Sequence, residues 1–190
     1  MEKQNLFKNN KVDYLTHFTN IYNLKSIIKN GILSVEYMNN NNINYNKTDK
    51  NRFDEQLNFI SISTNCINKK MLYKKICNNI GGLNIWIILI LDLSLLDDLK
   101  TDIYFCYKNA ASFEIKNILM TNKEKLNTPP FLNKFLISDD IQKEILVKNR
   151  IPIEYVKGII VKNPNDKDIV NNILLSEGKT IPIICKRDMF

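Results

Sequence analysis

The chain has 190 residues, 44% of them hydrophobic, which is enough to bury the core of one ordinary domain and excludes general disorder. Its formal charge of +7 suits a polyanionic partner such as a nucleic acid, although the Lys and Asn codon bias of an AT-rich genome also explains it. The longest apolar run, residues 85–91, is too short to cross a bilayer, and the N-terminus lacks the apolar segment of a signal peptide. We therefore expect no membrane association.

The cysteines and the single histidine have no metal-site spacing. Cys66, Cys77, Cys106 and Cys185 are far apart in the sequence, so neither a Cys-x-x-Cys pair nor a zinc pattern is present. We expect reduced thiols, no bound metal and a cytoplasmic protein.

The first predicted unit is a strand, a helix and a glycine. Residues 14–18 alternate and predict a strand, Thr19 and Asn20 provide an N-cap, and residues 21–30 have apolar positions at helical spacing. Gly31 ends this helix. The free N–H groups at its start suit a pyrophosphate. Residues 38–51 lack an apolar period and predict a surface loop.

The middle of the chain predicts alternating strands and helices. Residues 59–63 form a strand that carries Ser61 and Ser63 on one face, and residues 71–80 form a helix. The continuous apolar run 85–91 predicts a central strand covered on both faces. A helical turn at 94–99 and a strand at 103–107 follow.

The last third begins with a polar segment, residues 121–130, which predicts a second mobile loop. Residues 135–137 and 144–147 flank a turn at 138–140, residues 156–161 form a strand, and residues 166–176 form a helix that Gly178 ends. Residues 181–185 form a final strand, and Pro182 indicates that it lies at a sheet edge. We expect one α+β domain over residues 1–190, without strict βαβ alternation.

Three patterns could carry chemistry, and each also has an ordinary structural interpretation. His17 lies near a strand end, where a lone histidine is more often a hydrogen-bonded structural residue. Arg52 and Asp54 are either a solvated loop ion pair or a phosphate-directed guanidinium held by a carboxylate. In an extended segment Gln142 and Glu144 share a face while Lys143 points outward, and a carboxylate there can stabilise an oxocarbenium-like transition state or accept a proton.

The order of these patterns resembles the ADP-ribosyltransferase fold, and more specifically the DarT family of DNA ADP-ribosyltransferase toxins. The resembling segments are residues 16–34, 52–54, 60–63, 71–73, 108–112 and 140–147. The resemblance implies a split antiparallel β-sandwich core with flanking helices, and NAD⁺ as a substrate with no metal. The segment 52–63, together with 108–112, is closer to the guanine-modifying branch.

The resemblance also implies roles for individual residues. Glu144 would be the catalytic carboxylate, Arg52 would lie at the pyrophosphate or assist the transfer step, and residues 121–130 would recognise the substrate. The implied NAD⁺-binding residues are His17, Phe18, Thr19, Asn23, Gly31, Leu33, Arg52 and Ser63.

The implied function is a cytoplasmic, monomeric toxin of a toxin–antitoxin or phage-defence system that transfers ADP-ribose to guanine in single-stranded DNA. An ADP-ribosyl-removing macrodomain would be the antitoxin. Lysines with Tyr45, Tyr73 or Tyr107 could contact the DNA, although half-buried core positions explain these tyrosines as well. The alternatives are a transferase acting on RNA or protein, an NAD⁺ glycohydrolase, or a catalytically silent nucleic-acid-binding module.

Overall fold

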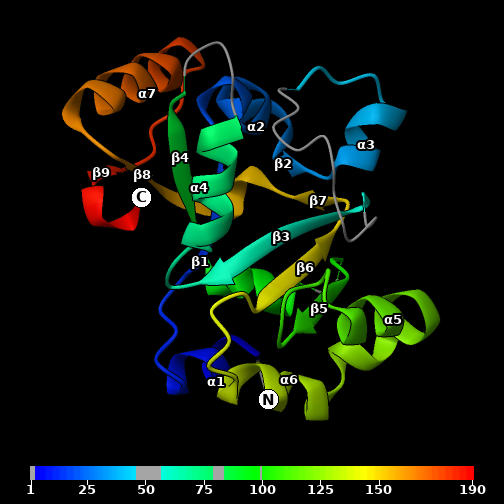
Figure 1. Ribbon diagram of the computed structural model, residues 1–190. Helices are drawn as coiled ribbons and strands as arrows, with labels where there is room; N and C mark the ends of the chain where they lie inside the picture. The colour runs from blue at the N-terminus through cyan, green and yellow to red at the C-terminus, as the bar shows by residue number, and fades with distance from the viewer. Residues whose placement is uncertain (1–2, 46–56, 79–83, 99) are drawn as a thin grey trace.

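The computed structural model describes residues 3–45, 57–78, 84–98 and 100–190, and Figure 1 shows their arrangement. The elements, with η denoting a 3₁₀ turn, are α1 Lys3–Asn9, β1 Leu15–Asn20, η1 Ile21–Asn23, α2 Leu24–Asn30, β2 Ile32–Leu33, α3 Val35–Asn40, β3 Phe59–Thr64, α4 Lys69–Asn78, β4 Trp86–Leu91, η2 Leu93–Asp97, β5 Ile103–Cys106, α5 Phe113–Asn122, η3 Lys123–Asn127, α6 Pro129–Ile137, β6 Glu144–Lys148, β7 Arg150–Ile151, η4 Ile153–Tyr155, β8 Val156–Val161, α7 Pro164–Ser176, β9 Ile183–Cys185 and η5 Arg187–Met189.

Seven strands form one sheet in the order β5-β6-β3-β1-β4-β8-β9, and β2 pairs separately with β7. Neighbouring strands in the large sheet are antiparallel except β8 and β9, which run parallel. The predicted α+β class is therefore confirmed. The last strand lies at the sheet edge, as Pro182 indicated.

The large sheet divides beside β1. On one side β1 pairs with β4 at all six of its residues, from Leu15 to Asn20. On the other side it pairs with β3 at only two positions, Leu15 with Thr64 and Thr16 with Ser63. The earlier residues of β3, 59–62, are paired with β6 on the opposite edge of β3 but not with β1. The strands β1 and β3 therefore diverge beyond Thr16, which gives the split arrangement that the resemblance implied.

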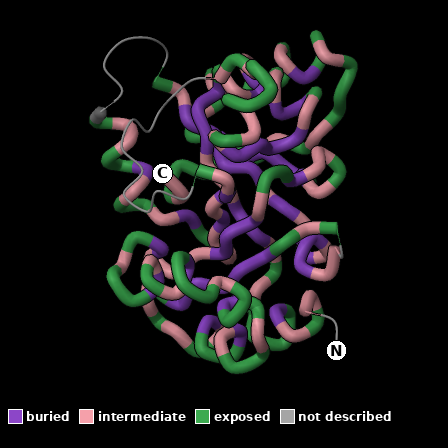
Figure 2. Tube along the Cα trace, turned by 90° about the vertical axis from the view of Figure 1, so that its right-hand side faces the viewer, coloured by how far each residue is buried: buried purple, intermediate pink, exposed green. Residues whose placement is uncertain are grey.

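The core lies on both faces of the central strands, as Figure 2 shows by the buried trace through the middle of the molecule. In β4, Ile87, Leu89 and Leu91 belong to the main buried cluster, while Trp86 and Ile88 belong to a second cluster on the opposite face. This confirms the prediction of a strand covered on both faces.

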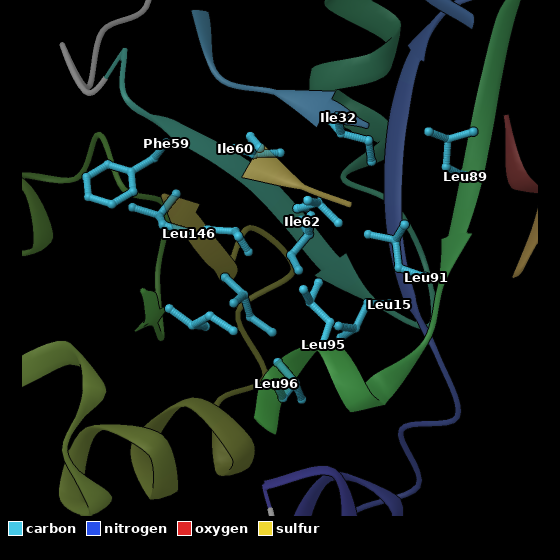
Figure 3. Close-up of a cluster of buried hydrophobic side chains, with 14 of the residues drawn as sticks. Leu15, Ile32, Phe59, Ile60, Ile62, Leu89, Leu91, Leu95, Leu96 and Leu146 are labelled. Atoms are coloured by element: carbon cyan, nitrogen blue, oxygen red, sulfur yellow. The ribbon is translucent and has the colours of Figure 1, made fainter. Parts of the chain in front are cut away.

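The main cluster continues from the strands onto η2. Figure 3 shows Leu15, Ile62 and Leu91 converging beside Leu95 and Leu96. All five side chains are at most 1% exposed. The side chains between these three strands and η2 therefore form a close-packed interior.

Three segments that were not predicted to be helical contain helix. Residues 121–130 contain the end of α5, η3 and the start of α6, because Leu126 and Leu132 are buried and Pro129 occupies the first helical position, where its missing N–H costs nothing. Residues 135–137 likewise complete α6. Part of the predicted loop at 38–51 is the end of α3, and residues 46–51 lie outside the described residues.

The N-terminal helix α1 was not expected. Phe7 is fully buried against the rings of Phe105 and Phe135, with ring centroids 5.8 and 5.9 Å away. The carboxylate of Asp97 accepts hydrogen bonds from the backbone N–H groups of Lys3 and Gln4 at 2.6 and 3.1 Å. A cap supplied from so far along the chain leaves no local sequence signal.

Gly31 ends α2 as predicted. Its φ is +79°, and a Cβ placed there would lie 2.4 Å from the carbonyl oxygen of Ile151. Only glycine fits this close approach to β7.

Within the described residues, no helix is long and apolar enough to cross a membrane.

Candidate active site

A cavity of about 380 Å³ lies where β1 and β3 diverge, a size within the range of roughly 300–1,000 Å³ that is usual for ligand pockets. Its walls come from β1, α2, the segment 31–35, β3, α4 and the start of β6. The missing ladder between two strands therefore leaves room for a ligand among otherwise close-packed elements.

Glu144, the first residue of β6, faces this cavity. One carboxylate oxygen accepts a hydrogen bond from the Ser61 hydroxyl of β3, and the other accepts one from the backbone N–H of Ala110 at 2.7 Å. Two donors from different segments fix the orientation of the side chain, which is half-buried. Hydrogen bonds to a carboxylate stabilise its charged form.

His17 lies across the split from Glu144. Its ring Nδ1 is 2.9 Å from the backbone carbonyl oxygen of Ser61. Because a carbonyl oxygen can only accept, Nδ1 donates in this bond, and a neutral ring then has its lone pair on Nε2. Ser61 thus orients both side chains, His17 through its carbonyl and Glu144 through its hydroxyl. The sequence singled out Ser61 only as one of a hydroxyl pair.

Those predicted NAD⁺-binding residues that the structure describes lie around one cavity. Phe18, Thr19, Asn23, Gly31, Leu33 and Ser63 all line the cavity with His17 and Glu144. Asn23 donates from its side-chain amide to the Thr19 hydroxyl at 3.1 Å, so two predicted contacts already support each other. Arg52 and Asp54 lie outside the described residues.

Two of the N–H groups that were predicted to be free at the start of the 21–30 segment already have partners. That segment begins as η1, and the N–H of Ile21 donates to the carbonyl of Ile85 at 3.0 Å. The N–H of Tyr22 donates to the Asn20 side chain at 3.0 Å. Because these groups are already satisfied, they do not serve a pyrophosphate.

Two cations of the cavity were missed by the sequence reasoning. Lys74 and Lys75 of α4 line the cavity wall. Two adjacent lysines on an amphipathic helix are too common a pattern to indicate a site. Their position against a cavity could not be inferred without the packing of α4.

Gln142 and Lys143 differ from the prediction. Gln142 lies in a turn before β6, where its N–H donates to the Asp140 side chain at 2.7 Å, so the extended pattern starts only at Glu144. Lys143 does not point outward. Its ammonium donates to the carbonyl oxygens of Phe135 and Ser138 at 3.1 and 2.6 Å, at the end of α6. Burial lowers the pKa of Lys143.

Of the three tyrosines considered for DNA contact, Tyr107 is excluded because it is only 3% exposed and its hydroxyl donates to the carboxylate of Glu114. That hydrogen bond lowers the pKa of Glu114. Tyr73 is 69% exposed, and Tyr45 lines the cavity.

The donor set suits a dinucleotide better than a metal ion. The cavity is lined by the aromatic residues Phe18 and Trp86, by Asn23 and Thr19 with an amide and a hydroxyl group, and by two lysines of α4. This set matches the bases, ribose hydroxyls and diphosphate of a dinucleotide. Among the described residues, no group of three His, Cys, Asp or Glu side chains could hold a metal ion.

Comparison with solved structures shows the same fold in DarT proteins. The DarT of Thermus sp. 2.9 in complex with NAD⁺ has a TM-score of 0.65 and 14% identity, covering 95% of this chain and 98% of that one. The same protein in complex with ADP-ribosylated ssDNA also has a TM-score of 0.65 and 14% identity, covering 95% and 97%. Thermosipho africanus DarTG in complex with ADP-ribose has a TM-score of 0.64 and 20% identity, and this chain, covered over 94%, spans 51% of its length.

A search of curated proteins found no match. Among protein families, residues 16–190 match the one described as "ssDNA thymidine ADP-ribosyltransferase, DarT", which confirms the predicted family and enzyme class but not the guanine-modifying branch. This match covers nearly the whole chain and continues through every described wall of the cavity. The chain belongs to the DarT family of ADP-ribosyltransferases.

Proposed function

We propose that this protein transfers ADP-ribose from NAD⁺ to a base of single-stranded DNA, with Glu144 as the catalytic carboxylate. The observation that carries the proposal is the carboxylate of Glu144, held by the Ser61 hydroxyl and the Ala110 N–H beside a cavity of dinucleotide character. Family membership supports the same chemistry. Related structures contain NAD⁺ in one case and ADP-ribosylated ssDNA in another.

The proposed binding of NAD⁺ follows from the lining of the cavity. His17, Thr19 and Asn23 offer polar groups to the nicotinamide-side ribose and amide, and Phe18 offers a ring face. The ammonium groups of Lys74 and Lys75 are suited to the diphosphate, because charge-assisted contacts to phosphate oxygens are strong. Arg52 lies outside the described residues, so its place at the pyrophosphate or in the transfer step stays a prediction.

The proposed reaction exchanges one C–N bond for another. The bond between nicotinamide and the ribose C1 breaks, nicotinamide leaves as a neutral molecule, and positive charge develops on the ribose. The negative charge of Glu144 stabilises that charge. A ring nitrogen of the acceptor base then bonds to C1, and its proton passes to Glu144.

Thymine and guanine are the two candidates for the acceptor base. The family description names thymidine, which gives thymine the stronger support, while guanine stays a prediction from segments 52–63 and 108–112. Both bases present a ring N–H between carbonyl or amino-bearing carbons, so one carboxylate can serve either. Single strands are favoured because a paired base must first be unstacked, which costs a few kcal/mol.

The test incubates the protein with NAD⁺ labelled in the adenylate and with single-stranded oligonucleotides that contain thymine but no guanine, or guanine but no thymine. We expect label on one of them, and a loss of roughly 10²–10⁴-fold in Glu144→Gln. Glu154→Gln is the matched control, because Glu154 is exposed and lies outside the cavity.

Other outcomes assign the site differently. Label transfer that survives in Glu144→Gln contradicts the role of this carboxylate. Release of free ADP-ribose with every acceptor would make the protein a glycohydrolase, and label on RNA or protein alone would change the acceptor class. The macrodomain antitoxin and the monomeric state stay predictions.

A further inference from the structure

Helix α4 carries several lysines and an exposed tyrosine beside the cavity, and no acidic residue lies near them in the sequence. The segment 66–78 contains Lys69, Lys70, Lys74 and Lys75 and no Asp or Glu. Leu72, which is 1% exposed, anchors the helix on the second buried cluster, so the helix cannot turn these charges inward. The charged face therefore belongs to the surface around the cavity.

The segment with the C-terminal turn η5 adds two cations, Lys186 and Arg187, and one acid, Asp188, beside this helix. The ammonium of Lys69 donates to the backbone carbonyl of Asp188, and Met189 packs on the same buried cluster as Leu72. This arrangement brings Lys186 and Arg187, both of which are exposed, close to the N-terminal end of α4. We name Lys69, Lys70, Tyr73, Lys186 and Arg187 the basic strip.

An exposed aromatic ring lies within the strip. Tyr73 is 69% exposed and sits one helical turn from Lys69, on the same helix face. An aromatic ring between cations is the combination with which proteins hold single-stranded nucleic acids, since bases stack on the ring and phosphates contact the cations.

The strip continues into the cavity. Lys74, one turn beyond Lys70, lines the cavity wall together with Met71. On the other side of Glu144 part of the positive charge is offset, because the carboxylate of Glu114 pairs with Lys108 at 3.1 Å and with Lys134 at 3.7 Å. Of these two flanks of the site, α4 has the larger net positive charge.

We propose that the basic strip holds the acceptor DNA strand on one side of the modified base, with Lys70, Lys186 and Arg187 contacting phosphates and Tyr73 stacking on a base. This inference rests on the proposed function and adds the path of the strand. Single-stranded DNA is the occupant because the exposed ring needs an unpaired base and the net charge needs a polyanion.

The test measures binding of a fluorescent oligonucleotide of about 12 nucleotides to Glu144→Gln, a background in which the strand is not consumed. Lys70→Gln/Lys186→Gln is compared with Lys157→Gln/Lys179→Gln, which removes the same charge from exposed positions outside the strip and the cavity. We expect the strip variant to raise Kd roughly tenfold, and to reduce the slope of log Kd against log salt by about 0.7 for each phosphate that is no longer neutralised. The control should change both much less.

Tyr73 gives an independent measurement. Tyr73→Ala should weaken binding about tenfold, while Tyr73→Phe should retain it, because stacking needs the ring and not the hydroxyl. In the active protein, the strip variants should raise KM for the oligonucleotide and leave KM for NAD⁺ unchanged.

The possible failures are distinguishable. Equal Kd and salt slope in the strip and control variants would overturn the strip while leaving base modification intact. If Glu144→Gln bound no oligonucleotide while the unchanged protein still cleaved NAD⁺, the proposal of a nucleic-acid acceptor itself would be overturned. Tighter binding of an oligoribonucleotide through the same residues would replace DNA by RNA as the occupant.

Discussion

The two sides of β1 have opposite characters. Toward β4 the strand is paired at all six residues, and the side chains of β4 are buried on both faces. Toward β3 it is paired at two positions, and beyond them the imidazole of His17 bonds to a backbone carbonyl of β3. One side therefore serves the stability of the fold, and the other leaves backbone and side-chain groups for a ligand.

This difference shows how two strands that are paired mainly on their far sides can carry side chains of a site between them. His17 and Ser61 stand on strands that are fixed on their far sides, by β4 next to β1 and by β6 next to β3. Rigid supports hold catalytic groups in a productive geometry more accurately than loops do. Substitutions on the two sides of β1 should therefore affect different quantities.

The largest effect on the paired side is expected from Leu89→Ala. Leu89 is fully buried and lies opposite His17 in β4, so its truncation leaves a cavity and should lower the free energy of unfolding by about 3 kcal/mol. Urea unfolding measures this. Leu175→Ala, at a side chain that is 65% exposed, is the control and should cost less than about 0.5 kcal/mol. A similar small cost for Leu89→Ala would contradict the comparison.

On the split side, His17→Ala should act on binding. We expect KM for NAD⁺ to rise by roughly tenfold or more, because the substitution removes both a polar group that lines the cavity and the bond to Ser61. Unfolding in urea should change by less than about 1 kcal/mol, since the ring is only half-buried. His17→Asn, whose amide can still donate, should recover part of the loss. An unchanged KM would remove His17 from the binding site.

Ser61→Ala separates the two roles of that residue. The backbone carbonyl that holds His17 remains, while the hydroxyl that orients Glu144 is removed. We therefore expect kcat to fall about tenfold with KM for NAD⁺ nearly constant, since a hydrogen bond to a charged group is worth roughly 1.5 kcal/mol. Thr64→Ala, on the same strand but outside the cavity, is the control. A change in KM alone would be the contrary result.

The smallest effect concerns acid stability at the end of the paired side. The N–H of Ser94 lowers the pKa of Asp92, and the N–H of Lys100 with the hydroxyl of Tyr155 lowers the pKa of Asp98. A folded pKa below the unfolded value of about 3.9 stabilises the fold above that pH, and the stabilisation is lost as pH falls through the folded pKa. The melting temperature should therefore drop below about pH 4, and less steeply in Asp98→Asn. Identical profiles would exclude this contribution.

Features encoded by local periodicity could be predicted from the sequence. The strand at 156–161 was placed correctly to the residue, and the apolar run at 85–91 indicated its double burial because both depend only on neighbouring side chains. The ends of elements beside prolines were harder. Pro129 starts a helix, whereas its polar surroundings favoured a loop.

The site was predictable only in part. The resemblance assigned His17, Asn23 and Glu144 to one site, and the structure places all three around one cavity. The role of Ser61 depends on where β3 stops pairing with β1. The inward course of Lys143 depends on the end of α6 lying beside it, which no local pattern encodes. Such contacts are set by long-range register and packing.

The burial of Phe7 has a consequence for where the folded unit starts. The family match begins at residue 16, yet α1 supplies a fully buried ring to Phe105 and Phe135 and is capped by Asp97. A protein shortened to the matched segment would expose both rings to water and leave a carboxylate without its two donors. The boundary of recognisable ancestry and the boundary of cooperative unfolding are therefore different, and expression of this enzyme should retain the residues before the match.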